Sequence, residues 1–367
     1  MSPDPIGRRA LNRAVLARQL LLRRHRLSAV ETVERLAGLQ AQEPLDPYLA
    51  LWTRLEGFRP EELAGLLTGR RVVRIALLRS TIHLVTVDDC LFMRPLVQLV
   101  IERMTMGTFG RRLVGLDAVA VTAAGRELVE DRPLTFSEIG SRLAERWPGH
   151  DGPSMAQAFR AWAPLVQVPP RGVWGSGGVA RHTTLEAWLG RPLDPSPSPA
   201  ELALRYLAAF GPASVMDLQA WSGLTRCREI LDGLRPRLRT FRNERGAELF
   251  DLPDAPRPDP DTPAPVRFLP EYDIILLGHA DRGRMARDEE RGLVFGDAGR
   301  GWGWILVDGL ARAVWRIERG REAATLVIRP FAPLSGAERN EVEEEGLRML
   351  QFRDAGIGCR RVEFNSN

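Results

Sequence analysis

Short amphipathic segments of this chain begin at a repeated arrangement of polar residues. Ser28, Thr135 and Ser214 are each followed three residues later by a Glu or an Asp and then by an apolar run of helical period. In such a capping box, the hydroxyl and the carboxylate each bond a backbone N–H that the first helical turn leaves free. The arrangement predicts helices over residues 32–39 and 139–147, and a third that starts near residue 217.

The second and third of these helices are each followed by a further helix and by β-rich residues. Helical period continues over 154–165 before a β-rich run at 166–168, while a helix is predicted over 226–234 and a hairpin over 238–252, with its turn near 243–246. Short helices, a longer helix and a β-hairpin in this order are typical of a winged helix-turn-helix. We therefore expect an α+β fold of three tandem winged helix-turn-helix domains with a C-terminal β-barrel-like domain.

Proline-rich segments set the expected domain boundaries. Residues 192–199 and 253–265 contain many prolines and few apolar anchors, as linkers do. The expected domains are residues 1–115, with an Arg-rich helix over 8–26 and strands over 72–78 and 81–87; residues 116–192; residues 199–253; and residues 266–367. In the last domain we expect strands over 268–277, 292–306, 311–318 and 324–328, and one helix over 335–352.

The composition is that of an ordinary globular protein. The chain has 367 residues, of which 44% are apolar and 27% are charged, enough for several cores. No apolar run approaches the roughly 20 residues that span a bilayer, and residues 1–5 lack the apolar stretch of a signal peptide, so we expect a cytoplasmic protein. Cys90, Cys227 and Cys359 lie far apart in the sequence, so we expect no disulfide framework, no metal site and no cofactor.

The basic side chains are all arginines. The sequence contains no lysine among its 51 basic residues, and its formal net charge is +4. No side-chain amine is therefore available for a Schiff base or a P-loop phosphate contact, whereas arginine suits bidentate phosphate contacts and base stacking. The candidates for phosphate contact are Arg8, Arg9, Arg70, Arg71, Arg111, Arg112, Arg226 and Arg228.

Two glutamines form the first candidate site, in the segment Leu39-Gln40-Ala41-Gln42-Glu43-Pro44. Gly38 is a plausible end for the preceding helix, and Pro44 disfavours helix in the residue before it. We therefore expect an extended path in which Gln40 and Gln42 share one face. Two convergent amides can position a water molecule without being titrated. The alternative is a pair of buried glutamines bonded to backbone groups, which is a common structural arrangement.

The densest polar signal lies further along the chain. Leu269-Pro270-Glu271-Tyr272-Asp273 precedes a second block that contains His279, Asp281 and Arg282. His279 and Asp281 have the chemistry of an acid and base pair, and the carboxylates of the two blocks have that of a magnesium site in a nuclease. The structural alternative is a buried hydrogen-bond network that organises the strand ends.

A glycine-rich stretch over residues 296–304 is expected at or near the tip of a hairpin. Glycine permits a tight turn and a close backbone approach, while Arg300 and Trp302 offer a wedge that can enter a narrow minor groove. The alternative is a surface loop with one tryptophan tucked into the barrel.

Together these motifs carry a family resemblance that covers nearly the whole chain. Their order and spacing resemble those of the winged-helix DNA glycosylases of the AlkZ and YcaQ group. The motifs are the glutamine pair, Arg79-Ser80-Thr81-Ile82-His83, the blocks at 269–273 and 279–282, and Val307-Asp308-Gly309 with Trp315. No single motif is specific, and the joint match carries the resemblance.

The resemblance implies a DNA glycosylase, and the absence of a lysine that could form a Schiff base predicts a monofunctional one. It would hydrolyse the N-glycosidic bond of N7-alkylguanine in double-stranded DNA, including bulky or crosslinking adducts, and leave an abasic site. In this group a glutamine pair, or a glutamine followed by an aspartate in the YcaQ branch, places the catalytic water, which implies Gln40 and Gln42 here. Gln42 makes the chain resemble the AlkZ branch, which includes self-resistance enzymes of organisms that make DNA-alkylating antibiotics.

The expected partner is double-stranded DNA, bound by a monomer. The expected DNA-contacting residues are His83, Arg79, Arg300, Trp302, Arg282, His279, Arg111 and Arg112. For His83, a structural role near a strand is the alternative. A non-catalytic winged-helix DNA-binding regulator that responds to the alkylating compound would share the same fold pattern, and a metal-dependent nuclease is a third alternative.

Overall fold

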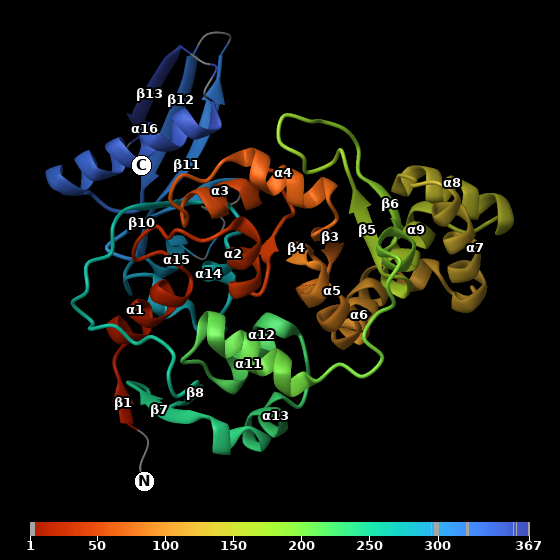
Figure 1. Ribbon diagram of the computed structural model, residues 1–367, viewed down its shortest axis with the longest axis horizontal. Helices are drawn as coiled ribbons and strands as arrows, with labels where there is room; N and C mark the ends of the chain where they lie inside the picture. The colour runs from red at the N-terminus through yellow and green to blue at the C-terminus, as the bar shows by residue number, and fades with distance from the viewer. Residues whose placement is uncertain are drawn as a thin grey trace.

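The chain has a mixed α and β architecture, as expected, with three β-sheets connected and covered by helices (Figure 1). The computed structural model describes residues 4–294, 296, 301–320, 323–354, 356 and 358–365. Two of the sheets have five strands and one has three. No helix in these ranges is long and apolar enough to cross a membrane.

Residues 8–86 supply four helices and three strands of the central sheet. The elements are α1 (Arg8–Arg18), α2 (Ala29–Arg35), β2 (Leu39–Gln40), α3 (Asp46–Trp52), α4 (Pro60–Thr68), β3 (Val72–Ala76), η1 (Leu78–Ser80) and β4 (Ile82–Thr86). The predicted capping box is present, since the Ser28 hydroxyl accepts from the Glu31 N–H and the Glu31 carboxylate accepts from the Ser28 N–H. The strands predicted over 72–78 and 81–87 also form, as β3 and β4.

Both predicted helices of this region end early, for a backbone reason. α1 ends at Arg18 rather than near residue 26, because Leu20 has a left-handed backbone with φ of 59°. α2 ends before Ala37 and Gly38, where φ is 55° and 95°. Left-handed residues cannot continue a right-handed helix. The chain therefore turns at Gly38 and enters β2 in an extended conformation, as Gly38 and Pro44 predicted.

Residues 87–189 add a helical lobe, at the right of Figure 1. The elements are α5 (Val87–Leu96), α6 (Gln98–Phe109), η2 (Gly110–Arg112), α7 (Ala118–Asp131), α8 (Phe136–Arg146), α9 (Gly152–Trp162), β5 (Leu165–Val168), β6 (Arg181–Thr184) and α10 (Leu185–Leu189). β5 pairs with β3, so one sheet runs in the order β2-β4-β3-β5-β6. The boundary expected at residue 115 does not separate two sheets, and three independent winged helices are not confirmed.

Residues 199–251 follow the predicted order of helices and hairpin. The elements are α11 (Pro199–Phe210), α12 (Val215–Ser222), α13 (Cys227–Gly233), η3 (Arg235–Arg237), β7 (Arg239–Asn243) and β8 (Glu248–Asp251). The hairpin turn contains Gly246 with φ of 76°, where the turn was predicted. The N-terminal strand β1 (Asp4–Ile6) adds to β7 in parallel, which the sequence did not predict.

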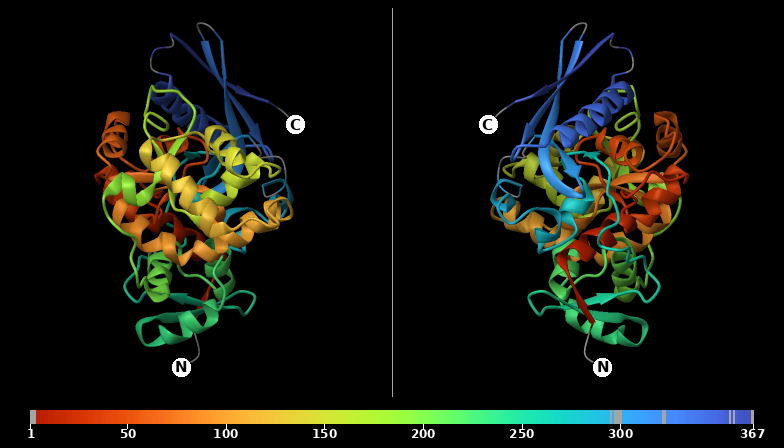
Figure 2. Two further views of the ribbon diagram at one scale, coloured as in Figure 1. Left: turned by 90° about the vertical axis from the view of Figure 1, so that its right-hand side faces the viewer. Right: turned by 90° about the vertical axis from the view of Figure 1, so that its left-hand side faces the viewer.

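The C-terminal sheet is open. Its elements are β9 (Arg267–Leu269), α14 (Ile274–Leu277), η4 (Arg282–Met285), α15 (Arg291–Val294), β10 (Gly303–Val307), β11 (Leu310–Arg319), β12 (Ala323–Pro330), α16 (Gly336–Arg353) and β13 (Cys359–Phe364). The strand order is β13-β12-β11-β10-β9, and within the described residues the edge strands β13 and β9 do not pair with each other. Because α16 packs across the sheet, against β9 and β13 alike, one face is covered without closure (Figure 2). The expected barrel-like closure is therefore wrong.

Two strands predicted in this part of the chain are shorter than expected. β9 ends at Leu269, because Asp273 caps α14 through its side chain. The strand expected over 292–306 begins only at Gly303, and residues 291–294 are helical. The turn of the β10–β11 hairpin lies at Asp308 and Gly309, which have φ of 47° and 76°. Two left-handed residues in succession are typical of a tight hairpin turn.

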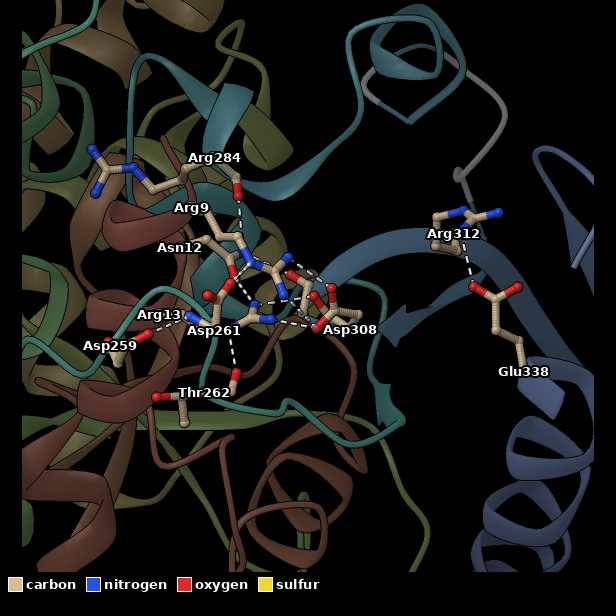
Figure 3. A network of polar contacts seen from close by, with 11 residues as sticks. Arg9, Asn12, Arg13, Asp259, Asp261, Thr262, Arg284, Asp308, Arg312 and Glu338 are labelled. Carbon is tan, nitrogen blue, oxygen red and sulfur yellow. Dashed lines mark hydrogen bonds and ion pairs between the residues drawn. The ribbon is translucent and has the colours of Figure 1, made fainter. Parts of the chain in front are cut away.

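The N-terminal helix α1 holds this turn (Figure 3). The Asn12 amide donates to the Gly309 carbonyl over 2.8 Å, and the buried Arg13 guanidinium donates to the Asp308 carboxylate. A Cβ at Gly309 would lie 2.5 Å from Leu16, so only glycine allows this close approach. Helix α1 and the C-terminal sheet are thereby joined through this turn.

A fully buried ion pair fixes the start of the C-terminal region against α3. Arg54 donates through Nη1 and Nη2 to the two Asp273 carboxylate oxygens, over 2.9 and 2.8 Å, and neither side chain is exposed. Arg54 also donates to the Gln19 and Ala50 carbonyls. Every polar atom of the pair that points inward is thus engaged, as a buried pair requires.

We expect Asp273→Asn to lower the free energy of unfolding by about 3–5 kcal/mol, because it leaves the Arg54 charge buried without its counter-ion. The change is measured as the shift of the urea unfolding curve. The matched control is Glu56→Gln, which breaks the exposed pair of Arg26 and Glu56 and should cost less than about 1 kcal/mol. Equal effects of the two substitutions would contradict a structural role for the buried pair.

Candidate active site

The two glutamines lie at the edge of the central sheet, on β2 and the residues that follow it. Gln40 pairs with His83 of β4, and the Ala41 N–H donates to the Ile82 carbonyl over 2.8 Å. β2 ends at Gln40, and the chain bends at Gln42, so a shared face for the two amides stays a prediction. Gln40 is 7% exposed, whereas Gln42 is exposed. The pair therefore runs from the protein interior to the surface.

An arginine sets the hydrogen bond of Gln42. In a regular antiparallel pair, the Ile82 N–H would donate back to the Ala41 carbonyl. Here the Ala41 carbonyl accepts from Arg74 Nη2 over 2.8 Å, and the Ile82 N–H donates to Gln42 Oε1 over 3.4 Å. The side-chain amide of Gln42 thus takes a place in the ladder that a backbone carbonyl would otherwise fill.

A second arginine bonds Gln40. Arg79 Nη2 donates to Gln40 Oε1, and Arg79 Nη1 donates to the Trp221 carbonyl, each over 3.1 Å. Burial lowers the pKa of Arg79 to about 10, and the nearby positive charge of Arg282 acts in the same direction. Arg79 therefore connects the glutamine pair to α12 and to the segment around Arg282.

Carboxylates and a tyrosine gather where the chain leaves the glutamine pair. Asp46 is 9% exposed, and its Oδ2 atom has no hydrogen-bond partner among the described residues. Burial raises the pKa of Asp46 to about 7, helped by the charges of Glu43 and Glu271. Burial and the hydrogen bond to Glu271 raise the pKa of Tyr272 to about 12. The block that contains Glu271 thus lies beside the glutamine segment.

The glycine-rich stretch is fastened to the same block. The Gly301 N–H donates to Glu271 Oε1 over 2.8 Å, and Trp304 Nε1 donates to the Glu271 carbonyl over 2.9 Å. Trp302 is partly buried, with the Arg316 and Arg329 guanidinium carbons 4.6 and 4.8 Å from its ring centroid. Trp302 therefore lies close to two arginines, directly before β10.

Both candidate histidines are buried. His83 is 1% exposed, its Nδ1–H donates to the Thr81 carbonyl over 3.0 Å, and burial lowers its pKa to about 3. His279 is 3% exposed and donates from Nε2 to the Phe210 carbonyl over 2.9 Å. Burial also lowers the pKa of His279, so both rings are uncharged at neutral pH. The predicted DNA contacts of these histidines remain predictions, and their visible bonds are structural.

The remaining predicted DNA-contacting residues are spread over the molecule. Arg282 begins η4 and is partly buried, and its charge acts on Arg79. Arg111 and Arg112 are exposed on η2, and Arg112 is 4.0 Å from Asp151. Arg300 lies outside the described residues. The structure thus brings Arg79 and Arg282 toward the glutamine pair and leaves Arg111 and Arg112 on another element.

The part of the chain that the structure describes contains no set of metal ligands. No group of three His, Cys, Asp or Glu side chains there is arranged to hold a metal ion. Asp281 instead accepts from the Gly283 N–H and pairs with Arg245 and Arg291, and Asp273 is committed to Arg54.

Two residues of the site were not identified from the sequence. Arg74 interrupts the apolar run Val72–Ala76, and a charge inside a buried strand was the available signal. Asp46 precedes Pro47 at the start of α3, where an aspartate is an ordinary helix-start residue. Only its burial in the folded chain distinguishes it.

Comparisons with known proteins give the family and the fold to which the chain is similar. Residues 33–352 match the profile of a family described as DNA glycosylase AlkZ-like. Among solved structures, Streptomyces sahachiroi DNA glycosylase AlkZ is similar, with a TM-score of 0.77 and 21% sequence identity. That match covers 98% of this chain and 100% of the other. A comparison with curated proteins finds no match.

Asp46 predicts a pH-dependent stability. Its folded pKa of about 7 lies above the ordinary value of 3.8, so the folded state binds more protons than the unfolded state between these values. Stability contributed by the protonated group is present at pH 4 and is lost as the pH rises through 7. Asp46→Asn should therefore raise the free energy of unfolding on the order of 2 kcal/mol at pH 8, and change it little at pH 4.

The measurement is urea unfolding of both proteins at pH 4 and pH 8. Asp88→Asn is the control, because the Asp88 side chain is 84% exposed. A difference between Asp46→Asn and the unmodified protein that stays constant with pH would disprove the assignment.

Proposed function

Because this chain belongs to the AlkZ-like DNA glycosylase family, and is thus a DNA glycosylase, we propose that its substrate is N7-alkylguanine in double-stranded DNA. The proposed reaction is hydrolysis of the N-glycosidic bond by a water molecule that Gln40 and Gln42 position, with an intact abasic site as the product. The proposed active form is a monomer. The observation that carries the proposal is the Gln40-Ala41-Gln42 segment at the end of β2, whose two amide oxygens each accept from a donor of the protein.

The chemistry of an N7-alkylguanine fits a site with amides and without a charged acid. Alkylation at N7 gives the base a positive charge, so it leaves without needing a proton from the enzyme. The remaining task is to hold a water molecule against an oxocarbenium-like sugar by position and electrostatics. His83 and His279 are buried and uncharged at neutral pH, which agrees with a reaction that uses no imidazolium.

The exposed end of the glutamine pair supports acceptance of large adducts. Gln42 is exposed at the edge of the sheet, so a bulky substituent on N7 has room beside it. We propose that bulky or crosslinking adducts are included among the substrates, as products of DNA-alkylating antibiotics would be. A role in self-resistance to such a compound would follow.

DNA contacts are proposed for residues on several elements. Arg79 carries a positive charge beside Gln40, and Arg282 carries a second one near Arg79, which suits a phosphate of the damaged strand. Arg111, Arg112 and Trp302 are proposed as further contacts, together with Arg300, His83 and His279 from the sequence prediction. The absence of lysine from the sequence leaves water rather than a side-chain amine as the nucleophile.

Free base should appear when the protein is incubated with duplex oligonucleotides that carry N7-methylguanine or a bulkier N7-alkylguanine, with a chelator present. The expected products are the modified base and an uncut strand with an abasic site, detected by mass spectrometry. An undamaged duplex is the control. Strand cleavage in step with base release, a borohydride-trapped covalent adduct, or DNA binding without any product would each refute the proposed reaction.

Gln40→Ala and Gln42→Ala should each slow single-turnover base release by about 100-fold, because water placement acts mainly in the transition state. DNA affinity should change by less than about threefold, since the reacting water contributes little to ground-state binding. The control is Gln351→Ala, a glutamine exposed on α16. Unchanged release rates in both site variants would remove the proposed role of the pair.

A further inference from the structure

We infer that Arg79 is a positioning residue that fixes the orientation of the Gln40 amide, and that Arg74 does the same for Gln42 through the backbone. This inference rests on the proposed function of the glutamine pair. The two arginines occupy comparable places: Arg74 is buried and Arg79 is partly buried, and each donates to an oxygen of the Gln40-Ala41-Gln42 segment.

The direction of the Gln40 amide follows from the chemistry of arginine. A guanidinium has five N–H donors and no acceptor, so Arg79 can bond only the oxygen of the amide. The contact of Arg79 Nη2 with Gln40 Oε1 therefore determines which end of the amide is oxygen, a choice that geometry alone rarely settles. Gln40 keeps one oxygen lone pair and its two N–H donors for other partners.

Arg74 does not bond the Gln42 side chain directly. It bonds the backbone carbonyl of the preceding residue, Ala41. The Ala41 carbonyl accepts from Arg74, and the Ile82 N–H donates to Gln42 Oε1 rather than to that carbonyl. Arg74 is 2% exposed, and its Nε–H donates to Gln167 Oε1 over 3.2 Å. The result is that both amide oxygens are held by donors of known direction.

Arg74 and Arg79 differ in their partners from two other arginines of the chain, Arg18 and Arg54. Arg18 and Arg54 are bonded to the carboxylates of Asp251 and Asp273. Within the ranges that the structure describes, neither Arg74 nor Arg79 has a carboxylate within ion-pair distance, and their acceptors are neutral oxygens. A buried charge with only neutral partners costs stability. Arg94 also has only neutral acceptors among the described residues. What distinguishes Arg74 and Arg79 is that they donate to Ala41 and Gln40.

The backbone at Arg79 also departs from the ordinary. Arg79 and Ser80 have φ of 53° and 58°, the left-handed region that non-glycine residues rarely adopt. Such strain persists where the surrounding structure requires it and is frequent at functional sites. Here the turn between β3 and β4 directs the Arg79 side chain to Gln40 and to the Trp221 carbonyl.

The fixed amides divide the work on the water. The Gln40 oxygen already accepts from a cation, which reduces its strength as an acceptor, whereas the Gln42 oxygen accepts from a neutral N–H. The stronger remaining acceptor is thus the Gln42 oxygen, which would accept a hydrogen bond from the water. Gln40 would hold the water in place at the buried end of the pair.

The first test is a double-mutant cycle on single-turnover base release from an N7-methylguanine duplex. Arg79→Ala should slow release by about 100-fold, as a misplaced catalytic group does. The double variant Arg79→Ala with Gln40→Ala should be no slower than the slower single variant, because both changes remove one unit. Added guanidinium ion should restore part of the rate of Arg79→Ala and none of that of Gln40→Ala.

The control variant is Arg94→Lys. Arg94 is 1% exposed and donates to Gln98 and to the Ala161 carbonyl, far from the glutamine pair in the sequence and without a carboxylate within ion-pair distance in the described residues. It should change unfolding without a selective effect on the release rate. Multiplicative effects in the double variant, or a loss of DNA affinity with an unchanged release rate, would overturn the positioning role.

A second measurement does not depend on activity. In protein labelled with 15N-glutamine, the side-chain NH₂ signals of Gln40, assigned by their loss in Gln40→Ala, should shift in Arg79→Ala, and less so in Arg79→Lys. Unshifted signals would overturn the inference even if base release is slow. Absence of base release in the unmodified protein would instead refute the proposed function and leave the spectroscopic result to decide on the amide.

Discussion

The buried ion pair of Arg54 and Asp273 brings two parts of the chain, 219 positions apart, into one site. Arg54 follows α3, the helix that begins a few residues after the glutamine pair, and Asp273 ends the block that carries Glu271 and Tyr272. Because the pair is fully enclosed and bidentate, its geometry leaves little freedom to either segment. The hydrogen bonds of Glu271 with Gly301 and Trp304 then hold the start of β10 against the same segment.

Local features of the fold were largely predictable, because they depend on neighbours in the sequence. The capping boxes at Ser28, Thr135 and Ser214 form as expected, and the hairpin turns near Gly246. The pairing of β3 with β5 was not predictable, because each strand was assigned to the wing of a different winged helix. Alternation of apolar and polar residues indicates a strand but does not determine which strand pairs with it. Closure of the C-terminal sheet failed as a prediction for the same reason.

The site was predictable in part. The turn signals around the glutamine pair were sufficient to predict that the chain is extended at Gln40. That both amides lie on one side stays a prediction. The arginines that hold them were not identifiable, because Arg74 and Arg79 approach from β3 and from the turn before β4. The composition had one further consequence: guanidinium groups stay charged at all ordinary pH values, so the orientation that they impose does not titrate.

The hydrogen bonds between α1 and the β10–β11 turn have a consequence for synthesis of the protein. Asn12 and Arg13 are buried polar side chains whose partners include Gly309 and Asp308, close to 300 positions later in the chain. Until the ribosome has released that hairpin, these two side chains have no native acceptors there. Helix α1 is therefore synthesised well before the turn that completes the contacts of Asn12 and Arg13.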